Sequence, residues 1–283
     1  MEEYYFLFGL AFLWTLFAVI QDLRKREVAN WLNFSFLAFA LVYRAFYAVS
    51  SGREEFFYFG VFGFLIFYAI AEGLYYSKAF GGGDARLLRA FGVILPFESF
   101  FLLIGNSIGF IFTLFFIGAA YTIVWSIFSL ARHFGNFKEE FIKIFIEQKK
   151  ILYISLIAII AVLLVPMDSF LKIYAVLLLL IIPLLYYYLK AIERSCFVKL
   201  TDAEKLTEGD WLEKDVKIGN RVIKKSIHGL SIGEIKELRK AKKKVWIKEG
   251  IPFVPVFLIT LIIMGFFYLA FGIDFAYLLK ALF

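Results

Sequence analysis

Two aspartates, Asp22 and Asp84, are the candidate reactive residues of this chain of 283 residues. Asp84 follows three glycines, Gly81 to Gly83, at the point where a polar loop turns into an apolar segment. Glycine permits positive φ angles and lets another segment approach closely, which is what a site for an extended peptide needs. A carboxylate facing a bilayer is costly, so Asp84 is a functional hypothesis. Asp22, at the end of an earlier apolar segment, adds a second acid at a matching depth.

The two acids have a structural and a chemical interpretation. An aspartate after glycine often caps a helix, because its carboxylate accepts the free N–H groups of the first turn. Two carboxyl groups held a few ångströms apart cannot both ionise cheaply, so their titrations separate. One can then take a proton from water while the other donates a proton to a carbonyl oxygen or a leaving nitrogen.

The helix ends predict which aspartate carries the proton. Asp22 falls at the C-terminal end of its expected helix, where the helix dipole disfavours negative charge and raises the pKa. Asp84 falls at an N-terminal end with Arg86 nearby, where a lowered pKa is expected. On this basis Asp84 activates water and Asp22 is the acid.

The composition places the chain in a membrane. Hydrophobic residues make up 62% of it, with 37 Phe and 16 Tyr, and the mean hydropathy is +0.80. The single cysteine, Cys196, excludes an internal disulfide framework. His133 and His228 have no metal-ligand spacing around them, so no metal or other cofactor is expected.

The apolar runs predict an all-α polytopic membrane protein with about eight transmembrane helices. The first run follows Glu2 and Glu3, without a basic segment or a cleavage site, and is expected to be a retained helix. Pro96 is expected to end a short fourth span. The predicted spans are residues 4–20, 32–49, 56–76, 85–96, 100–130, 151–165, 170–189 and 253–271.

The basic residues predict the orientation. Lys and Arg gather in the loops 22–30, 77–89 and 131–150. We expect the protein to lie in the plasma membrane with these loops on the cytoplasmic side. Both termini are then expected outside, and Asp22 and Asp84 at the cytoplasmic edge of the membrane.

Residues 190–250 are charged and mixed, and predict a small cytoplasmic α/β lobe before the last span. Two short strands are expected around Gly219 and Asn220, and Ser231 with Glu234 predicts a capping box that opens a helix. The basic run at 240–244 is expected to contact anionic lipid head groups and not nucleic acid. The expected domains are a membrane-embedded core at 1–189, the lobe at 190–250, and a final helix and tail at 251–283.

A known pattern covers both aspartates. The residues before and including Asp84 fit Gly-x-Gly-Asp, and Asp22 is followed eight positions later by Asn30. Arg86 stands where the pattern usually has Lys and keeps the charge. The chain thus resembles the type IV prepilin peptidase family of membrane aspartic proteases, and looks most like its archaeal preflagellin and class III signal peptidase branch. The resemblance covers residues 1–130 and recurs at 206–210 and 250–255.

The resemblance implies an endopeptidase that removes the short basic leader of prepilin-like and preflagellin-like precursors at the cytoplasmic face. The partners it implies are archaellin-like or pilin-like precursors with class III signal peptides. A cysteine-rich insert of the bacterial members is missing, so their N-methylation activity is not expected. The implied catalytic residues are Asp22 and Asp84, supported by Gly81, Gly83, Arg86 and Asn30, and speculative partners of the basic leader are Glu27 and Glu72.

Other classes share parts of this pattern. A transporter with a glycine-broken helix tends to bind near the bilayer midplane between repeats, and the chain has no internal repeat. A presenilin-like intramembrane protease shares Gly-x-Gly-Asp but has a Pro-Ala-Leu near its C-terminus that is absent here. A lipid-headgroup transferase needs further spaced aspartates, and a purely structural membrane protein needs no acid pair.

Overall fold

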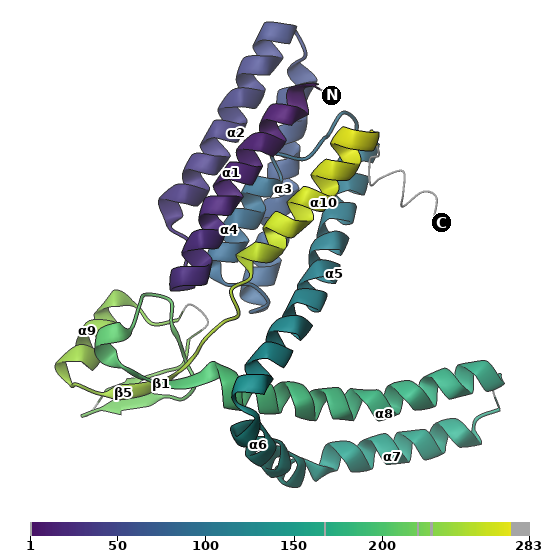
Figure 1. Ribbon diagram of the computed structural model, residues 1–283, viewed down its shortest axis with the longest axis vertical. Helices are drawn as coiled ribbons and strands as arrows, with labels where there is room; N and C mark the ends of the chain where they lie inside the picture. The colour runs from purple at the N-terminus through teal and green to yellow at the C-terminus, as the bar shows by residue number, and fades with distance from the viewer. Residues whose placement is uncertain (1, 167, 220, 227–228, 273–283) are drawn as a thin grey trace. The chain divides into compact units, whose positions relative to one another are not determined.

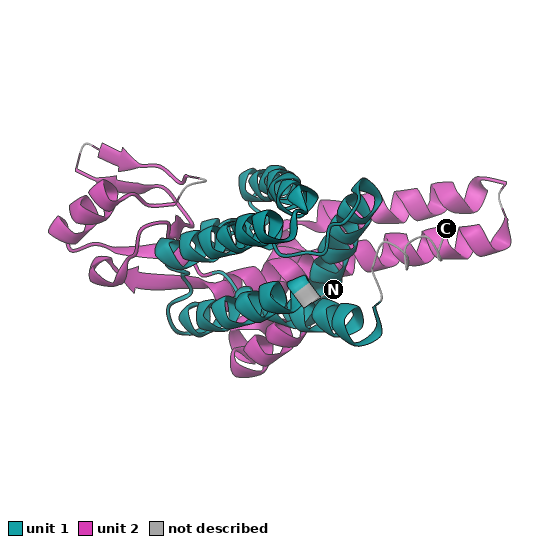
Figure 2. Ribbon diagram, turned by 90° about the horizontal axis from the view of Figure 1, so that it is seen from above, with its two compact units in different colours: residues 1–123, 250–283 teal, residues 124–249 magenta. Residues whose placement is uncertain are grey.

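The computed structural model describes residues 2–166, 168–219, 221–226 and 229–272. It divides into two compact units, one of residues 1–123 with 250–283 and one of residues 124–249 (Figure 2). The last helix therefore belongs to the first unit, although the lobe separates it from that unit in sequence. These limits differ from the expected boundary after residue 189, which stays a prediction.

The first unit is a bundle of helices (Figure 1). Its core is made of buried aromatic and aliphatic side chains, and α10 packs along α1 while α4 packs against α2 and α3. The helices are α1 (Glu2–Lys25), α2 (Asn30–Ser51), α3 (Glu54–Tyr76), α4 (Gly82–Phe91), the first part of α5 (Phe100–Arg132) and α10 (Val254–Phe271).

Six described helices are long and apolar enough to cross a membrane: α1, α2, α3, α5, α8 (Ser169–Ile192) and α10. This supports a multi-pass membrane protein, but the predicted eight spans are not confirmed. The other two expected spans correspond to α4, with 10 residues, and α7 (Lys149–Leu164), with 16. A helix needs about 20 residues to cross a hydrocarbon core of about 30 Å.

Residues 82–97 nevertheless run from one end of the first unit to the other. Near the start, the Arg86 guanidinium donates a hydrogen bond to Asn30, the first residue of α2. At the far end, the Phe97 N–H donates to the Tyr4 hydroxyl at 3.2 Å, close to the beginning of α1. The helix itself stops at Phe91, five residues before Pro96, and the remainder is irregular. The fourth predicted segment is thus a short helix followed by a non-helical stretch.

Arg44 of α2 satisfies the backbone of that stretch. Its side chain is fully buried, and its guanidinium donates to the carbonyl oxygens of Val93 at 2.6 Å and Leu95 at 2.7 Å. A third bond reaches the carbonyl of Phe56 at 2.6 Å, and the Phe56 ring centroid lies 4.5 Å from the guanidinium carbon. Carbonyl groups that leave a helix inside an apolar core need such partners. Arg44 therefore stabilises the non-helical backbone that follows α4.

Two glycines let α3 and the end of α4 touch. A Cβ atom on Gly63 would lie 2.2 Å from the Gly92 carbonyl oxygen, and one on Gly92 would lie 2.5 Å from the Gly63 oxygen. No larger residue fits at either position without a backbone shift. This contact fixes the depth of α4 against α3.

The second unit contains helices and a small mixed lobe. α6 (Phe134–Glu147), α7 and α8 pack together, with a π-helical turn, η1 (Glu193–Phe197), after α8. The lobe has a sheet with strand order β1-β5-β2, formed by β1 (Val198–Asp202), β5 (Lys244–Lys248) and β2 (Trp211–Leu212), all antiparallel. The remaining elements are a 3₁₀ turn, η2 (Ala203–Lys205), a hairpin of β3 (Val216–Ile218) and β4 (Arg221–Ile223), and α9 (Ile232–Lys240).

Two local predictions for the lobe are confirmed. β3 pairs with β4 around Gly219, which takes a positive φ of 55°, while Asn220 lies outside the described residues. Ser231 and Glu234 form the predicted capping box at the start of α9. His228 also lies outside the described residues.

Candidate active site

Asp22 lies near the end of α1 and is held by the start of α10. Its side chain is 6% exposed, and the backbone N–H of Val254 donates to Asp22 Oδ2 at 2.9 Å. Val254 is the first residue of α10, where backbone N–H groups have no partner within the helix. The N-terminal end of a helix carries a partial positive charge. A negative charge on Asp22 is therefore stabilised by a helix that begins 232 residues later.

The segment that leads into α10 is fixed on both sides. Arg26 Nη1 donates to the Gly250 carbonyl oxygen at 3.1 Å, just beyond the end of α1. The Phe253 ring packs 5.3 Å from the Phe80 ring, and a Cβ on Gly118 of α5 would lie 2.8 Å from Phe253. Phe80 precedes the three glycines. The start of α10 thus packs against the middle of α5 and the residue that precedes the glycines, next to the end of α1.

Asp84 is the third residue of α4, and Gly81 is its N-cap. The glycine run does not use the positive φ angles that glycine permits: Gly81 has φ −70°, and Gly82 and Gly83 belong to α4. Gly81 leaves space for the Asp84 carboxyl group, since a Cβ at position 81 would lie 3.3 Å from Asp84 Oδ2. A Cβ on Gly83 would make an ordinary contact with Val28 at 3.6 Å. The structural alternative, in which Asp84 itself is the N-cap, does not hold.

Burial, and after it the negative charge of Asp22, together raise the pKa of Asp84 from 3.8 to about 7. A hydrogen bond with the Gly81 backbone opposes this shift but is the smallest of the three causes. Asp84 lies in α4, outside the six candidate spans. The expected lowering of this pKa by the helix terminus is therefore wrong. The two carboxyl groups therefore lie within electrostatic reach of each other.

The motif residues around the pair are brought together. Arg86, two residues after Asp84, donates to Asn30 Oδ1 across 56 positions of sequence. The α1–α2 loop is closed by a bond from the Ala29 N–H to Gln21 Oε1 at 2.9 Å. The end of α1, the start of α2 and the start of α4 therefore meet at one end of the first unit.

Comparison with protein families gave one match. Residues 9–127 match the type IV leader peptidase family. This confirms the resemblance to the prepilin peptidases, and the family indicates a peptidase. The match spans less than half of the chain and contains both aspartates, Asn30 and Arg86. The searches of curated proteins and of solved structures gave no match.

The leader peptidase match ends before α10, so the residues that hold Asp22 lie outside it. Sequence reasoning noted a resemblance at residues 250–255 but gave Phe253 and Val254 no role. A helix N-terminus preceded by Gly250 and Pro252 was the signal that could have indicated them, since a helix start favours a nearby carboxylate.

The two speculative glutamates of the leader peptidase segment differ in their surroundings. Glu72 of α3 already pairs with Arg89 of α4 at 2.5 Å, and Arg89 lies over the Tyr68 ring at 4.7 Å. Glu27 is exposed in the α1–α2 loop. A substrate lysine would therefore compete with Arg89 at Glu72, whereas the Glu27 carboxylate is exposed to an incoming leader. Their proposed role stays a prediction.

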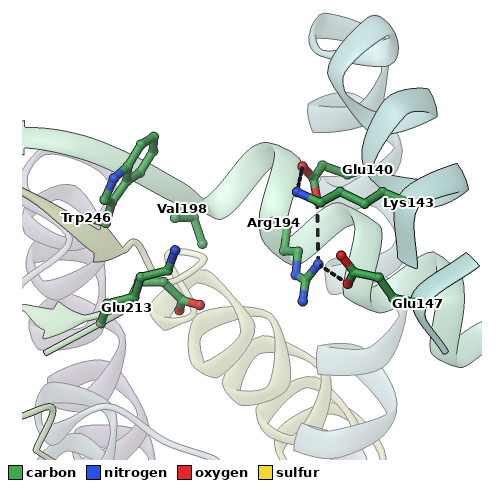
Figure 3. A pocket seen from close by; sticks show the side chains of 8 residues that line it. Glu140, Lys143, Glu147, Arg194, Val198, Glu213 and Trp246 are labelled. Atoms are coloured by element: carbon green, nitrogen blue, oxygen red, sulfur yellow. Dashed lines mark hydrogen bonds and ion pairs between the residues drawn. The ribbon is translucent and has the colours of Figure 1, made fainter. Parts of the chain in front are cut away.

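A separate cavity of about 470 Å³ lies within the second unit (Figure 3). Its polar wall is an ion-pair cluster in which Arg194 contacts Glu147 at 3.3 Å and Glu140 at 3.7 Å. Lys143 pairs with the same Glu140 at 3.7 Å. None of the predicted site residues lines this cavity. Glu140, Lys143, Glu147 and Arg194 are paired with one another, so this cluster offers no free charge for a reaction.

Proposed function

We propose that the chain is a membrane aspartic endopeptidase with Asp22 and Asp84 as its catalytic pair. The observation that carries the proposal is the electrostatic coupling of these carboxyl groups, which come from separate helices. Gly81, Gly83, Arg86 and Asn30 support them, as the motif implies. The family match over both residues supports a peptidase, and two coupled carboxyl groups supply the acid and the base of peptide hydrolysis.

The roles of the two aspartates follow from their surroundings. Asp22, with the Val254 N–H directed at Oδ2, is the ionised base that takes a proton from water. The water oxygen attacks the peptide carbonyl carbon, and protonated Asp84 donates its proton to the carbonyl oxygen. When the C–N bond breaks, the nitrogen receives the proton that Asp22 took from water and leaves as an amine, while one hydroxyl of the tetrahedral intermediate returns a proton to Asp84 as the carbonyl re-forms. These roles are the reverse of those predicted from the helix ends alone.

The substrates we propose are precursors with class III signal peptides, such as archaellin-like or pilin-like proteins, whose short basic leader precedes an apolar helix. Cleavage would occur at the cytoplasmic face of the plasma membrane, with both termini outside and membrane lipids around the helices. No cofactor and no nucleic acid take part. Basic residues gather in the loops on one side of the predicted topology, and the connections on the other side hold few of them. This asymmetry supports the orientation.

The test is co-expression of the full chain with a panel of class III precursors, followed by gel mobility and by N-terminal sequencing of the product. A shortened precursor with a new N-terminus after the basic leader is the expected result. Precursors whose leader lysines are replaced by glutamate serve as controls and should stay uncut. Intact precursors across the whole panel would refute the proposed function.

A further inference from the structure

Asn33 of α2 is a buried amide that the fold leaves unused. Its side chain is 4% exposed, and neither Oδ1 nor Nδ2 has a hydrogen-bond partner among the described residues. Leaving a buried donor and acceptor unpaired destabilises a protein. Positions where a chain breaks such a rule are commonly functional ones.

The neighbours of Asn33 show which way it faces. Asn30 and Phe36, three residues before and after it, both contact α4: Asn30 bonds to Arg86, and the Phe36 ring packs 5.9 Å from Phe91. Residues three apart lie on the same face of a helix. Asn33 therefore faces α4 between Arg86 and Phe91, about one turn deeper than the Asn30 contact.

That part of α4 offers the amide no partner. Between Arg86 and Phe91, the side chains of Leu87, Leu88 and Ala90 are buried and apolar, and the Arg89 guanidinium is paired with Glu72 of α3. Asp84 lies on the same helix, one turn before Leu88. A free donor and a free acceptor thus lie against an apolar surface next to the catalytic pair.

The amide has the chemistry of a peptide-binding group. It presents a donor on one atom and an acceptor on another, the arrangement that complements the C=O and N–H of a peptide group. The other buried side-chain atoms without a hydrogen-bond partner among the described residues are the Thr15 and Thr260 hydroxyls, Arg89 Nε and Glu213 Oε2, and the last of these lies 3.1 Å from Lys248 Nζ in an ion pair. None of these combines a donor and an acceptor on two atoms. Among the described residues, Asn33 alone does so.

A bound peptide substrate would have backbone groups that need such a hydrogen-bond partner. A peptide must be extended for the catalytic carboxyl groups to reach its backbone, and an extended segment in an apolar site has unsatisfied N–H and C=O groups. Access is no greater obstacle for Asn33 than for the catalytic base, because Asp22 is equally buried at 6% exposed. An opening that admits the substrate to Asp22 would also uncover the adjacent face of α2.

We propose that the Asn33 side chain binds a backbone peptide group of the extended substrate next to the scissile bond. This inference rests on the proposed peptidase function. Asn33 takes no proton and acts by binding and orienting the peptide, so its contribution lies in substrate affinity.

The test compares Asn33→Leu with Thr260→Val in the full chain. Both changes remove an unpaired buried polar group, and Thr260 lies in α10 with its hydroxyl unpartnered. With a purified precursor, we expect Asn33→Leu to raise KM about tenfold while kcat changes less than about threefold. Thr260→Val should leave both constants unchanged. Both variants should unfold at or above the wild-type temperature, since each removes an unsatisfied group.

A second measurement covers a failure to fold. In an Asp84→Asn background, which blocks cleavage, capture of the precursor in detergent should weaken about tenfold on Asn33→Leu. If Asn33→Leu does not accumulate, Asn33→Ala takes its place with the same expectation. If the Asn33 variant had the KM of the wild type and captured the precursor as strongly, the inference would be overturned. The proposed peptidase function would still stand. Absence of cleavage by the wild-type chain would overturn the proposed function and the substrate assigned to Asn33 with it.

Discussion

Asp22 Oδ2 accepts a hydrogen bond at 2.9 Å from the backbone N–H of Val254, which lies beyond the lobe in sequence. This bond joins a carboxylate in the first helix to the start of the last one. The family match stops at residue 127, so the part of the chain that carries the motif does not include the group that bonds to Asp22, the base in the proposed mechanism. A peptidase core made of residues 1–249 alone would lack that bond.

Replacing either aspartate of the proposed catalytic pair should abolish cleavage. Asp22→Asn and Asp84→Asn each remove a role that the other carboxyl group cannot fill, so we expect a loss of about 10³-fold or more in cleavage rate. Both proteins should still insert and accumulate. Asp210→Asn is the control, because Asp210 accepts the Thr207 N–H at 2.8 Å and an asparagine keeps an oxygen there. Substantial turnover by either site variant would rule out the pair.

The raised pKa of Asp84 predicts a pH dependence of both activity and stability. Activity should fall as the pH rises above about 7, because the acid then loses its proton. The folded-state pKa of about 7 exceeds the unfolded value of 3.8, so the stabilising contribution is complete below 3.8 and lost as the pH rises through about 7.

Thermal unfolding of Asp84→Asn provides the measurement. The variant cannot ionise, so it should be more stable than the wild type near pH 8, with a difference that shrinks toward pH 4.5. A stability difference that does not change with pH would contradict the raised pKa.

Truncating Phe253 should loosen the start of α10 and reduce cleavage. Phe253→Ala removes the packing against Phe80 and Gly118, which positions the Val254 N–H at Asp22. We expect the cleavage rate to fall about tenfold and the unfolding free energy by about 2 kcal/mol, since the ring is only partly buried. Phe266→Ala, on an exposed face of the same helix at 58% exposure, should change neither. Equal rates for the two variants would show that this packing does not position Asp22.

Replacing Arg44 should destabilise the first unit. Arg44→Met removes three hydrogen bonds and leaves the carbonyl groups of Val93, Leu95 and Phe56 without this partner in an apolar core. The expected cost is about 3 kcal/mol or more in unfolding free energy, seen as a lower unfolding temperature in detergent. Arg132→Met, at the exposed end of α5, should change stability by less than about 0.5 kcal/mol. A variant at Arg44 as stable as the one at Arg132 would refute this role.

Chelation should leave the activity intact. The proposed mechanism uses two carboxyl groups and water, so incubation with a strong chelator before the cleavage assay should not change the rate. Reagents directed at serine or cysteine should also have little effect. A loss of cleavage that added zinc restores would contradict the mechanism.

Much of the site could be predicted from the sequence because it depends on local features. The Gly-x-Gly-Asp motif and the eight-residue spacing of Asp22 and Asn30 are properties of continuous segments. The hairpin around Gly219 and the capping box at Ser231 likewise depend on residues a few positions apart. Hydropathy placed the long helices, because about 20 apolar residues in succession are needed to cross a bilayer.

The tertiary structure decided what depends on distant residues. A helix terminus contributes about 0.3–1 kcal/mol, less than one pKa unit, whereas burial beside Asp22 moves the pKa of Asp84 from 3.8 to about 7. The local argument therefore predicted the wrong direction for the shift in the pKa of Asp84. The hydrogen bond from Val254 and the carbonyl contacts of Arg44 also could not be predicted from the sequence, because each joins segments that only the packing of the helices brings together.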